Sequence, residues 1–383
     1  MPSLPEPSAE ALQHSRQLTR LIQQDIAHHN GWISFARFME LALYSPGLGY
    51  YSAGAAKFGA AGDFVTAPEI SSLFGRTLAR QVAQVLQLTG GNVLEAGAGS
   101  GRLALQLLSE LEKLDSLPTQ YFILEVSADL QKRQHAYLNL QAPHLANRVV
   151  WLDALPASFN GVILGNEVLD AMPAHLVSWH ADGLHERGVT LHPNTFAWHD
   201  QPLTQGILFE AASEIQAPSD YVSEINLAAR GFIASLAHIL QNGIILMIDY
   251  GFGESEYYHP QRAQGTLMCH YRHHAHADPF YLPSLQDITA HVDFSAIALA
   301  GIDNGLQLLG YTTQASFLLN CGITDVLAET SPENAGAYLP LANQAQKLLS
   351  PAEMGELFKV IALGKNFSGP LTGFSAGDKS RLL

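Results

Sequence analysis

The sequence predicts an α/β protein with a mostly parallel, seven-stranded sheet that carries helices on both faces. From Asn92 onward, short apolar runs of strand length alternate with stretches of helical length. The first of these runs ends in a glycine-rich turn, which opens a helix near Arg102. Strands that alternate with helices are typical of parallel sheets, because each crossover places a helix against the sheet.

The composition is that of a compact, acidic globular chain. Its 383 residues are 47% hydrophobic and only 14% charged, which excludes a disordered polyelectrolyte. Lys and Arg total 20 against 35 Asp and Glu, a formal net charge of -15, so we expect no nucleic acid partner and favour a cationic one. No apolar run reaches the roughly 18 to 20 residues that a membrane span requires.

The cysteines and the first residues bear on the cellular compartment. Cys269 and Cys321 are too few for a disulfide scaffold or a four-cysteine zinc site, and they suit a reducing compartment. The opening residues, MPSLPEPSAEALQ, have neither the basic and apolar regions of a secretory signal nor an Arg-rich presequence. We therefore expect a cytoplasmic protein.

A helical region that includes a glycine-rich loop is expected over residues 1–88, before the sheet. Residues 9–29 place apolar side chains at helical spacing, and a second helical stretch covers 35–44. A Gly-, Ala- and Tyr-rich loop follows, and a further helix starts after Thr66 and runs to the end of this region. Residues 89–383 then form the domain that holds the sheet.

The strands are expected at apolar runs, with a β-rich insertion after the fourth. Residues 175–202 alternate apolar and polar side chains and contain the turn signal Asp182-Gly183, so we place the insertion at about 172–225, with a helix near 221–240. Six of the seven expected strands are located: NVLEAG (92–97), YFILEV (121–126), VVWL (149–152), GVILGNE (161–167), NGIILMIDYG (242–251) and GELFKVIALGK near the C-terminus.

The glycine turn is the strongest local sign of a ligand. Glu95 ends a buried strand, and Gly97, Gly99 and Gly101 alternate before the helix. Glycines let a backbone approach a ligand closely, and a helix N-terminus offers free N–H groups to a phosphate or carboxylate. The dinucleotide pattern G-x-G-x-x-G fails when it starts at Gly97, but its permissive form ending in Ala fits from Gly99. We expect a nucleotide-like ligand, whose identity this turn alone leaves open.

Further carboxylates extend this site. Glu95 before three alternating glycines resembles the E-x-G-x-G-x-G signature of class I S-adenosylmethionine methyltransferases. Glu125 ends the next strand, where a carboxylate can accept hydrogen bonds from both hydroxyls of an adenosine ribose, in S-adenosylmethionine and NAD alike. Asp153 follows the third strand and could face the adenine amino group, with a helix cap or a surface turn as the alternative.

Several longer segments resemble one family, the MidA-like S-adenosylmethionine methyltransferases, relatives of the mitochondrial arginine methyltransferase that assists complex I assembly. The matching segments lie between about 35 and 365: FMELALYSPGLGYY, GDFVTAPEISSLFG, the glycine turn, GNEVLDAMPAH, LMIDYGFGESEYYHPQRAQGTLMCHYRH, DITAHVDF and GELFKVIALGK. The resemblance implies a Rossmann-like class I methyltransferase fold and S-adenosyl-L-methionine as cofactor. It also implies a protein substrate, for which a respiratory-complex subunit is one candidate.

The resemblance assigns roles by position. The glycines of the turn would line the methionine and ribose side of the cofactor, and Glu125 would hold the ribose. The Asp63 carboxylate would pair with the cofactor's ammonium group in a segment that closes over it. With Asp153, the expected cofactor-binding residues are Gly62, Asp63, Phe64, Glu95, Gly97, Gly99, Gly101, Glu125 and Asp153.

The end of the fourth strand is the expected methyl-acceptor side. Asn166, Glu167 and Asp170 lie there, and ligands of parallel sheets bind outside the carboxyl ends of the strands. Arginine is a poor nucleophile, since its charge is delocalised and its pKa exceeds about 12. Two carboxylates could orient its guanidinium, provided that Glu167 and Asp170 share one face of a helix. Otherwise Asp170 caps a helix or forms a local salt bridge, and Glu167 faces solvent.

Other features leave alternatives open. Asp249 and Tyr250 end strand five at the same edge, without an assigned role. The histidines of the segment from His270 to His276 lack a cysteine pair or an HExxH pattern beside them, so we expect a solvated or substrate-facing surface and no metal. The functional alternatives to a methyltransferase are a non-catalytic assembly factor that keeps this fold and an NAD-dependent oxidoreductase.

Overall fold

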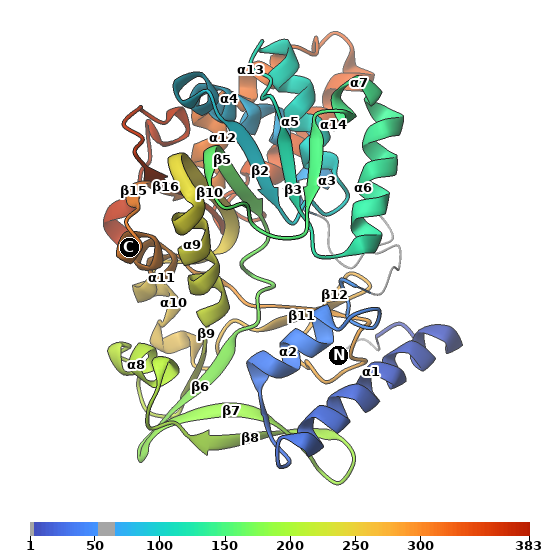
Figure 1. Ribbon diagram of the computed structural model, residues 1–383, viewed down its shortest axis with the longest axis vertical. Coiled ribbons are helices and arrows are strands. Elements are labelled where there is room, and N and C mark those ends of the chain that lie inside the picture. Colours follow the sequence, from blue (N-terminus) through green and yellow to red (C-terminus); the bar gives the residue numbers. More distant parts are fainter. Residues whose placement is uncertain (1–3, 53–65) are drawn as a thin grey trace. The chain divides into compact units, whose positions relative to one another are not determined.

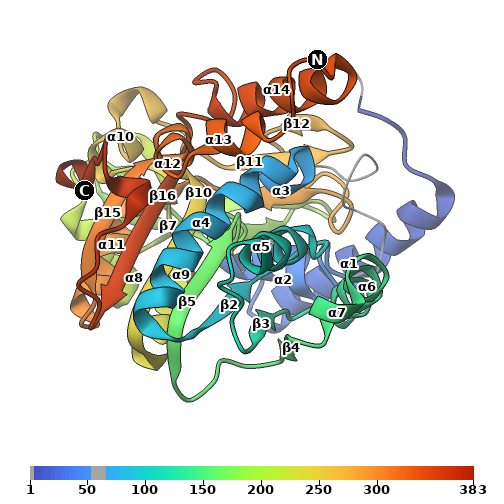
Figure 2. The ribbon, with the colours of Figure 1, turned by 90° about the horizontal axis from the view of Figure 1, so that it is seen from above.

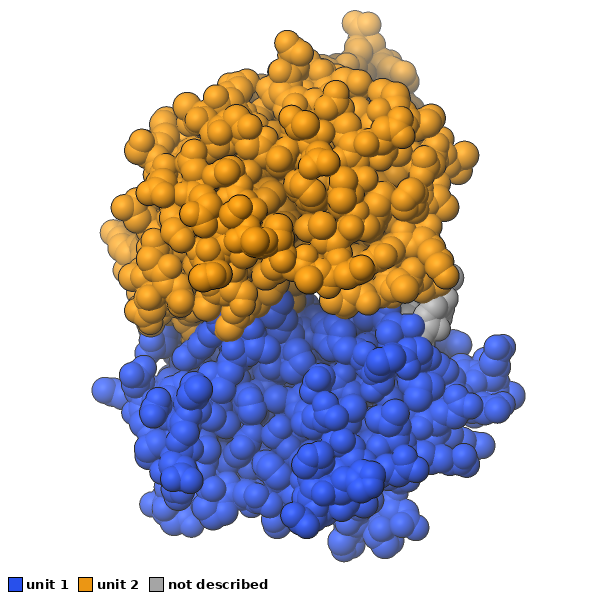
Figure 3. Space-filling model, in the orientation of Figure 1, with its two compact units in different colours: residues 1–64, 170–230, 254–292 blue, residues 65–169, 231–253, 293–383 orange. Residues whose placement is uncertain are grey.

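The computed structural model describes residues 4–52 and 66–383. The chain divides into two compact units, and each unit is assembled from separate segments of sequence (Figure 3). Unit 1 comprises residues 1–64, 170–230 and 254–292, and unit 2 comprises residues 65–169, 231–253 and 293–383.

This division differs from the predicted boundary at residue 88, which falls inside helix α4 (Ser72–Thr89). Phe74, Leu78 and Val82, on the apolar side of α4, are fully buried in the core of unit 2. A region 1–88 therefore does not separate from 89–383, because α4 is part of the core that surrounds the sheet.

Unit 2 is built around a mixed sheet (Figure 1). The strand order is β15-β16-β10-β5-β2-β3-β4, and an eighth short strand, β14, pairs with β10. Neighbours from β4 through β10 are parallel, whereas β16 is antiparallel to both β10 and β15. The strands are β2 (Asn92–Ala96), β3 (Tyr121–Leu124), β4 (Val149–Leu152), β5 (Phe159–Asn166), β10 (Leu240–Phe252), β14 (Val292–Asp293), β15 (Gln307–Thr313) and β16 (Phe358–Lys365).

Helices cover both faces of this sheet, as the sequence predicts. Val360 and Ala362 of β16 share a core cluster with α4, which lies beside α5 (Figure 2). Leu363 points to the opposite face, where a Cβ on Gly301 of α11 would lie 2.8 Å from its Cδ1. The helices are α3 (Ala67–Ile70), α4, α5 (Arg102–Lys113), α6 (Ala128–Gln141), α7 (Pro143–Ala146), α9 (Leu227–Ile239), α11 (Phe294–Asp303), α12 (Gln314–Asn320), α13 (Ile323–Ala328) and α14 (Ala335–Leu349), with 3-10 turns η3 (Thr372–Phe374) and η4 (Ser380–Leu382).

Unit 1 contains two smaller sheets with helices packed on them. The first has the order β1-β7-β6-β9 with β8 beside β7, and the second has the order β12-β11-β13. Ile22 and Ile26 of α1 pack with Phe38 of α2 and Val189 of β7 in its core. The elements are α1 (Ala9–His28), β1 (Ile33–Ser34), α2 (Phe35–Tyr44), β6 (His175–His180), β7 (Gly183–Leu191), β8 (Phe196–Pro202), α8 (Ile207–Glu214), β9 (Tyr221–Ile225), α10 (Glu254–Tyr257), η2 (Pro260–Arg262), β11 (Met268–Tyr271), β12 (His274–His276) and β13 (Asp287–Thr289).

The elements of unit 1 follow the sequence predictions in part. The helices expected over 9–29 and 35–44 are confirmed as α1 and α2. The expected helix over 221–240 begins only at Leu227, because Tyr221–Ile225 pairs with β6 as strand β9. Within the described residues, no helix is both long and apolar enough to cross a bilayer.

Candidate functional site

The glycine turn follows β2 with the backbone conformation that its glycines permit. Gly97, Gly99 and Gly101 have φ values of 64°, 54° and 82°, all in the left-handed region that side chains disfavour. Gly101 is the N-cap of α5 and has no side chain with which to cap it. A Cβ on Gly99 would meet no described atom within 4 Å, so the turn borders open space at that position. A ligand can therefore approach its backbone closely.

Helix α3 holds this turn from one side. The Ser100 hydroxyl donates a hydrogen bond to the Glu69 carboxylate. Arg102 pairs with the same carboxylate, with 2.8 Å between Nε and Oε2. The Glu69 side chain is only 7% exposed. The sequence predicts a helix that starts after Thr66, and the spacing of Glu69 from the turn gives no sign of this contact.

Glu125 is a nearly buried carboxylate directly after β3. One oxygen accepts a hydrogen bond from the Ser127 N–H at 3.0 Å, and the other accepts one from Nε2 of Gln134 at 3.0 Å. Burial raises the pKa of the carboxyl, and these two hydrogen bonds oppose that rise. Each oxygen keeps acceptor capacity, as a ribose with two hydroxyls would require.

Glu95 lies in the interior rather than on the turn's open side. Its carboxylate is 2% exposed and accepts a hydrogen bond from the Tyr121 hydroxyl at 2.7 Å. Burial raises the pKa of Glu95 to about 7; the Tyr121 hydrogen bond opposes this rise, and the charge of Glu125 adds to it. The side chain is thus a buried support of β2 whose charge depends on pH near neutrality.

Asp153 is exposed after β4 and connects to Glu125 through one glutamine. Nε2 of Gln131 donates to the Asp153 carboxylate at 3.2 Å and to the Glu125 carbonyl at 2.7 Å. Val126, between Glu125 and α6, is 77% exposed and places an apolar side chain at this edge. The expected residues Gly62, Asp63 and Phe64 lie outside the described residues.

The end of β5 forms a turn and not a helix. Glu167 has φ of 53°, and its N–H donates to the Ile248 carbonyl at 2.9 Å. One Asp249 oxygen accepts from the N–H groups of Val168, at 3.2 Å, and Leu169, at 3.0 Å. Asp249 therefore fixes this turn, and the expectation that Glu167 and Asp170 share a helix face is wrong.

The predicted acceptor residues belong to different units. Asn166 and Glu167 are in unit 2, where Nδ2 of Asn166 donates to Glu167 Oε1 at 3.0 Å. The buried Oδ1 of Asn166 has no hydrogen-bond partner among the described residues. Asp170 begins the second segment of unit 1, where its carbonyl accepts from the Ala290 N–H at 3.0 Å. Asn166 thus presents an open acceptor, which suits a cationic donor group.

The histidine segment forms a hairpin of β11 and β12 within unit 1. Cys269 pairs with His276 in its register, and the His276 ring lies against Tyr281 with 5.5 Å between centroids. Burial lowers the pKa of His276. In the described part of the chain, no three His, Cys, Asp or Glu side chains converge as metal ligands.

Two solved structures from Burkholderia thailandensis are similar to the chain over its whole length. One contains bound S-adenosyl-homocysteine; it is 53% identical, with a TM-score of 0.97, and the match covers 100% of both chains. The other is a native structure, 52% identical with a TM-score of 0.94, and again 100% of both chains is covered.

Curated relatives are more distant. The protein arginine methyltransferase NDUFAF7 of Danio rerio is 26% identical, over 87% of this chain and 83% of the relative. Its Caenorhabditis elegans homolog is 27% identical, over 77% of this chain and 74% of the relative. Both are named mitochondrial, as is the homolog of Drosophila melanogaster, and these names contradict the expected cytoplasmic location.

A protein-family model provides the remaining comparison. The model of S-adenosyl-L-methionine-dependent methyltransferases matches residues 77–312, which include the glycine turn, Glu125 and the end of β5. The open space beside Gly99 and the acceptor capacity of Glu125 fit such a cofactor. The chain therefore belongs to the S-adenosyl-L-methionine-dependent methyltransferases, and S-adenosyl-L-methionine is its cofactor.

Proposed function

We propose that this methyltransferase transfers a methyl group to an arginine of a protein substrate. The observation that carries the proposal is the name shared by the curated relatives, protein arginine methyltransferase, over 87% of this chain in the fish relative. A respiratory-complex subunit is a candidate substrate on the family resemblance alone. Membership of the methyltransferase family removes the support for the NAD-dependent alternative.

The cofactor is proposed to lie along the carboxyl ends of β2, β3 and β4. The backbone of Gly97, Gly99 and Gly101 and the N-terminus of α5 would take its methionine and ribose side, because the turn is open beside Gly99. Glu125 would accept from the ribose hydroxyls. The exposed Val126 offers an apolar contact for the adenine ring and Asp153 an acceptor for its amino group. Glu95 would support β2 behind the turn, and Gly62, Asp63 and Phe64 remain proposed closing residues.

The seven strands from β15 to β4 in the order given above are proposed to form a class I methyltransferase sheet. Five parallel strands and an antiparallel β16 between β10 and β15 support this assignment. The chain between β5 and β10 includes β6 to β9, which we assign to an insertion after the fourth strand of this sheet. The insertion would span about 172–225.

Asn166, Glu167 and Asp170 are proposed to act on the acceptor guanidinium. The bound cofactor supplies a methyl group on a positively charged sulfur. Guanidinium carries five N–H donors and accepts no hydrogen bond. The open Oδ1 of Asn166 and the Glu167 carboxylate are both hydrogen-bond acceptors, so they can bind such a group. Carboxylates would hold positive charge on two nitrogens while the third forms a bond to the methyl carbon as the carbon–sulfur bond breaks. The methylated nitrogen would then release a proton to the Glu167 carboxylate or to water. Asp249 would keep these groups in place through the turn after β5.

The test is a labelled transfer to protein. Purified protein, labelled S-adenosylmethionine and lysate from its own source should yield a labelled protein, and mass spectrometry should locate the label on arginine. Gly99→Ala should reduce the label at a cofactor concentration near the wild-type Kd. Methylated lysine would contradict the arginine assignment. If no protein is labelled but a partner still binds the Gly99→Ala variant, the assembly-factor alternative takes the place of this proposal.

A further inference from the structure

Gln134 is a polar residue on the inward, apolar side of helix α6. Leu130, Gln134 and Leu138 recur every fourth residue, and all three are buried. Gln134 is 0% exposed. A buried amide lowers the stability of the fold unless its donors and its acceptor form hydrogen bonds.

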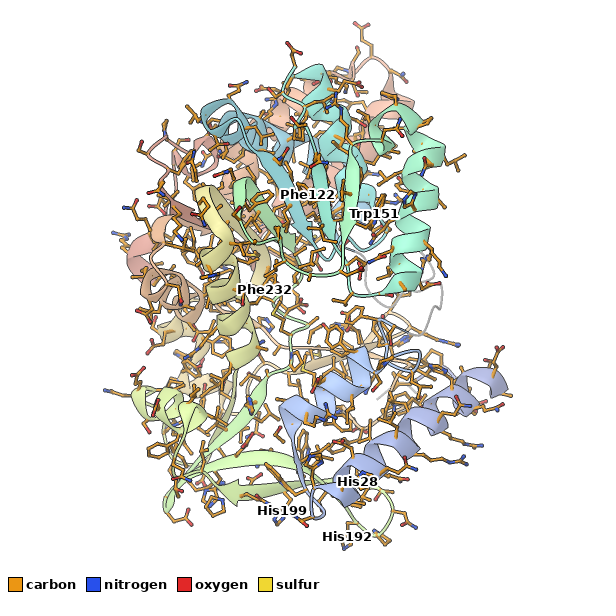
Figure 4. The ribbon with its side chains drawn as sticks, viewed as in Figure 1. His28, Phe122, Trp151, His192, His199 and Phe232 are labelled. Atoms are coloured by element: carbon orange, nitrogen blue, oxygen red, sulfur yellow. The ribbon has the colours of Figure 1, made fainter. Side chains whose placement is uncertain are left out.

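All of the polar atoms of Gln134 are paired. Nε2 donates to the carbonyl of Gly99 at 3.0 Å and to Oε2 of Glu125 at 3.0 Å. Oε1 accepts from Nε1 of Trp151 at 2.9 Å. Trp151 lies on β4 beside α6 (Figure 4). Its ring stacks on that of His135 with 4.1 Å between centroids.

These partners fix the orientation of the amide. Indole Nε1 is only a donor, so the amide oxygen must face Trp151. The Gly99 carbonyl is only an acceptor, so the amide nitrogen must face it, and one N–H then remains for Glu125. A flipped amide would lose all three hydrogen bonds. The side chain is therefore held in one state.

We propose that Gln134 is a positioning residue that sets the recognition of the cofactor's ribose by holding the Glu125 carboxylate. This inference rests on the proposed role of Glu125. A carboxylate offers about four acceptor positions. Ser127 and Gln134 donate to one oxygen each, so Gln134 directs the orientation of a carboxylate that keeps acceptor capacity for ribose hydroxyls. Gln134 also ties Glu125 to Gly99, so the two parts of the cofactor site keep a fixed separation.

The test is a double-mutant cycle on S-adenosylhomocysteine affinity, measured by calorimetry. Gln134→Met keeps the length of the side chain but cannot donate, and it should weaken binding about tenfold. In the Glu125→Ala background the same change should have a smaller effect, because the carboxylate that Gln134 positions is absent and only the hydrogen bond to the Gly99 carbonyl is lost. The wild-type preference for S-adenosylhomocysteine over its 2′-deoxyribose analogue should shrink in the Gln134→Met variant.

Gln81→Met is the matched control. Gln81 is also fully buried in unit 2, where it donates to Gln84 at 2.8 Å and accepts from the Gly373 N–H at 2.8 Å. Its loss should lower stability without changing the discrimination between the two ligands. If Gln134→Met behaves like Gln81→Met, Gln134 has only a structural role and the inference is overturned.

Gln134→Glu gives a second measurement that retains the shape of the side chain. Two carboxylates in hydrogen-bond contact cannot both ionise readily, and one shared proton restores a donor toward Glu125. Affinity should therefore fall more at pH 8 than at pH 6. The inference is overturned if Gln134→Glu loses the same affinity at pH 6 and pH 8. It is also overturned if Gln134→Met loses the same affinity in the wild type and in the Glu125→Ala background. If Glu125→Ala alone leaves affinity unchanged, the proposed placement of the cofactor fails instead.

Discussion

Replacement of Glu95 by Gln should remove a pH-dependent loss of stability. Burial raises the pKa of this carboxyl from 4.5 to about 7. Between these values the folded protein keeps a proton that the unfolded chain has released, so the free energy of unfolding decreases as the pH rises through this window. About 2.5 pH units at about 1.36 kcal/mol each give a loss of about 3 kcal/mol, complete above pH 7.

Gln fits the site because the Tyr121 hydroxyl can donate to its oxygen as it does to Glu95 at 2.7 Å. The unpaired amide N–H groups cost stability at every pH, so the informative quantity is the change with pH. Urea unfolding of the cofactor-free protein should show the wild type losing about 3 kcal/mol relative to Glu95→Gln between pH 4.5 and pH 8. Glu353→Gln, at an exposed position, is the control for the removal of one carboxylate.

Tyr121→Phe sharpens this test. The variant removes the hydrogen bond that lowers the pKa of Glu95, so the window of decreasing stability should extend to higher pH. A stability difference between wild type and Glu95→Gln that is constant from pH 4.5 to pH 8 would refute the reasoning.

The remaining predictions concern the site. Gly99→Ala should raise the Kd for S-adenosylhomocysteine at least tenfold. Gly305 also has positive φ and open space beside it, so Gly305→Ala should lower the free energy of unfolding by about 1 to 2 kcal/mol and leave the Kd unchanged. Glu167→Gln and Asp170→Asn should each lower methylation by about tenfold to a thousandfold with little change in cofactor affinity; normal methylation by both variants contradicts their role. Asp249→Asn should lower kcat about tenfold by loosening the turn after β5, and retained kcat counts against it. Activity should survive chelation, and stoichiometric zinc whose removal abolishes activity would reverse that expectation.

The sequence predicted those parts of the site that depend on local chain chemistry. Gly97, Gly99 and Gly101 between a strand and a helix indicated the turn, and all three adopt positive φ. Glu125 was placed by counting strands, and the structure has it directly after β3. These features can be predicted from sequence because backbone conformation and strand ends depend on short segments.

The parts that were missed depend on contacts between distant segments. Gln134 is visible in sequence only as a polar residue in an apolar stripe, and its partners come from β4 and from two different loops. The turn at Glu167 requires Asp249, which is 80 residues from Leu169. The helix predicted from Tyr221 was displaced because β9 pairs with β6, and pairing outweighs local propensity.

The position of β16 has a consequence for synthesis of the chain on the ribosome. This strand lies between β10 and β15, yet it is the last of the three to be made. Residues 253–357 separate β10 from it, so at about 5 to 20 residues per second the edge of β10 waits roughly 5 to 20 s for its partner. An unpaired strand edge invites association with other chains during that time. A nascent protein of this design would therefore benefit from a chaperone until its C-terminal segment emerges.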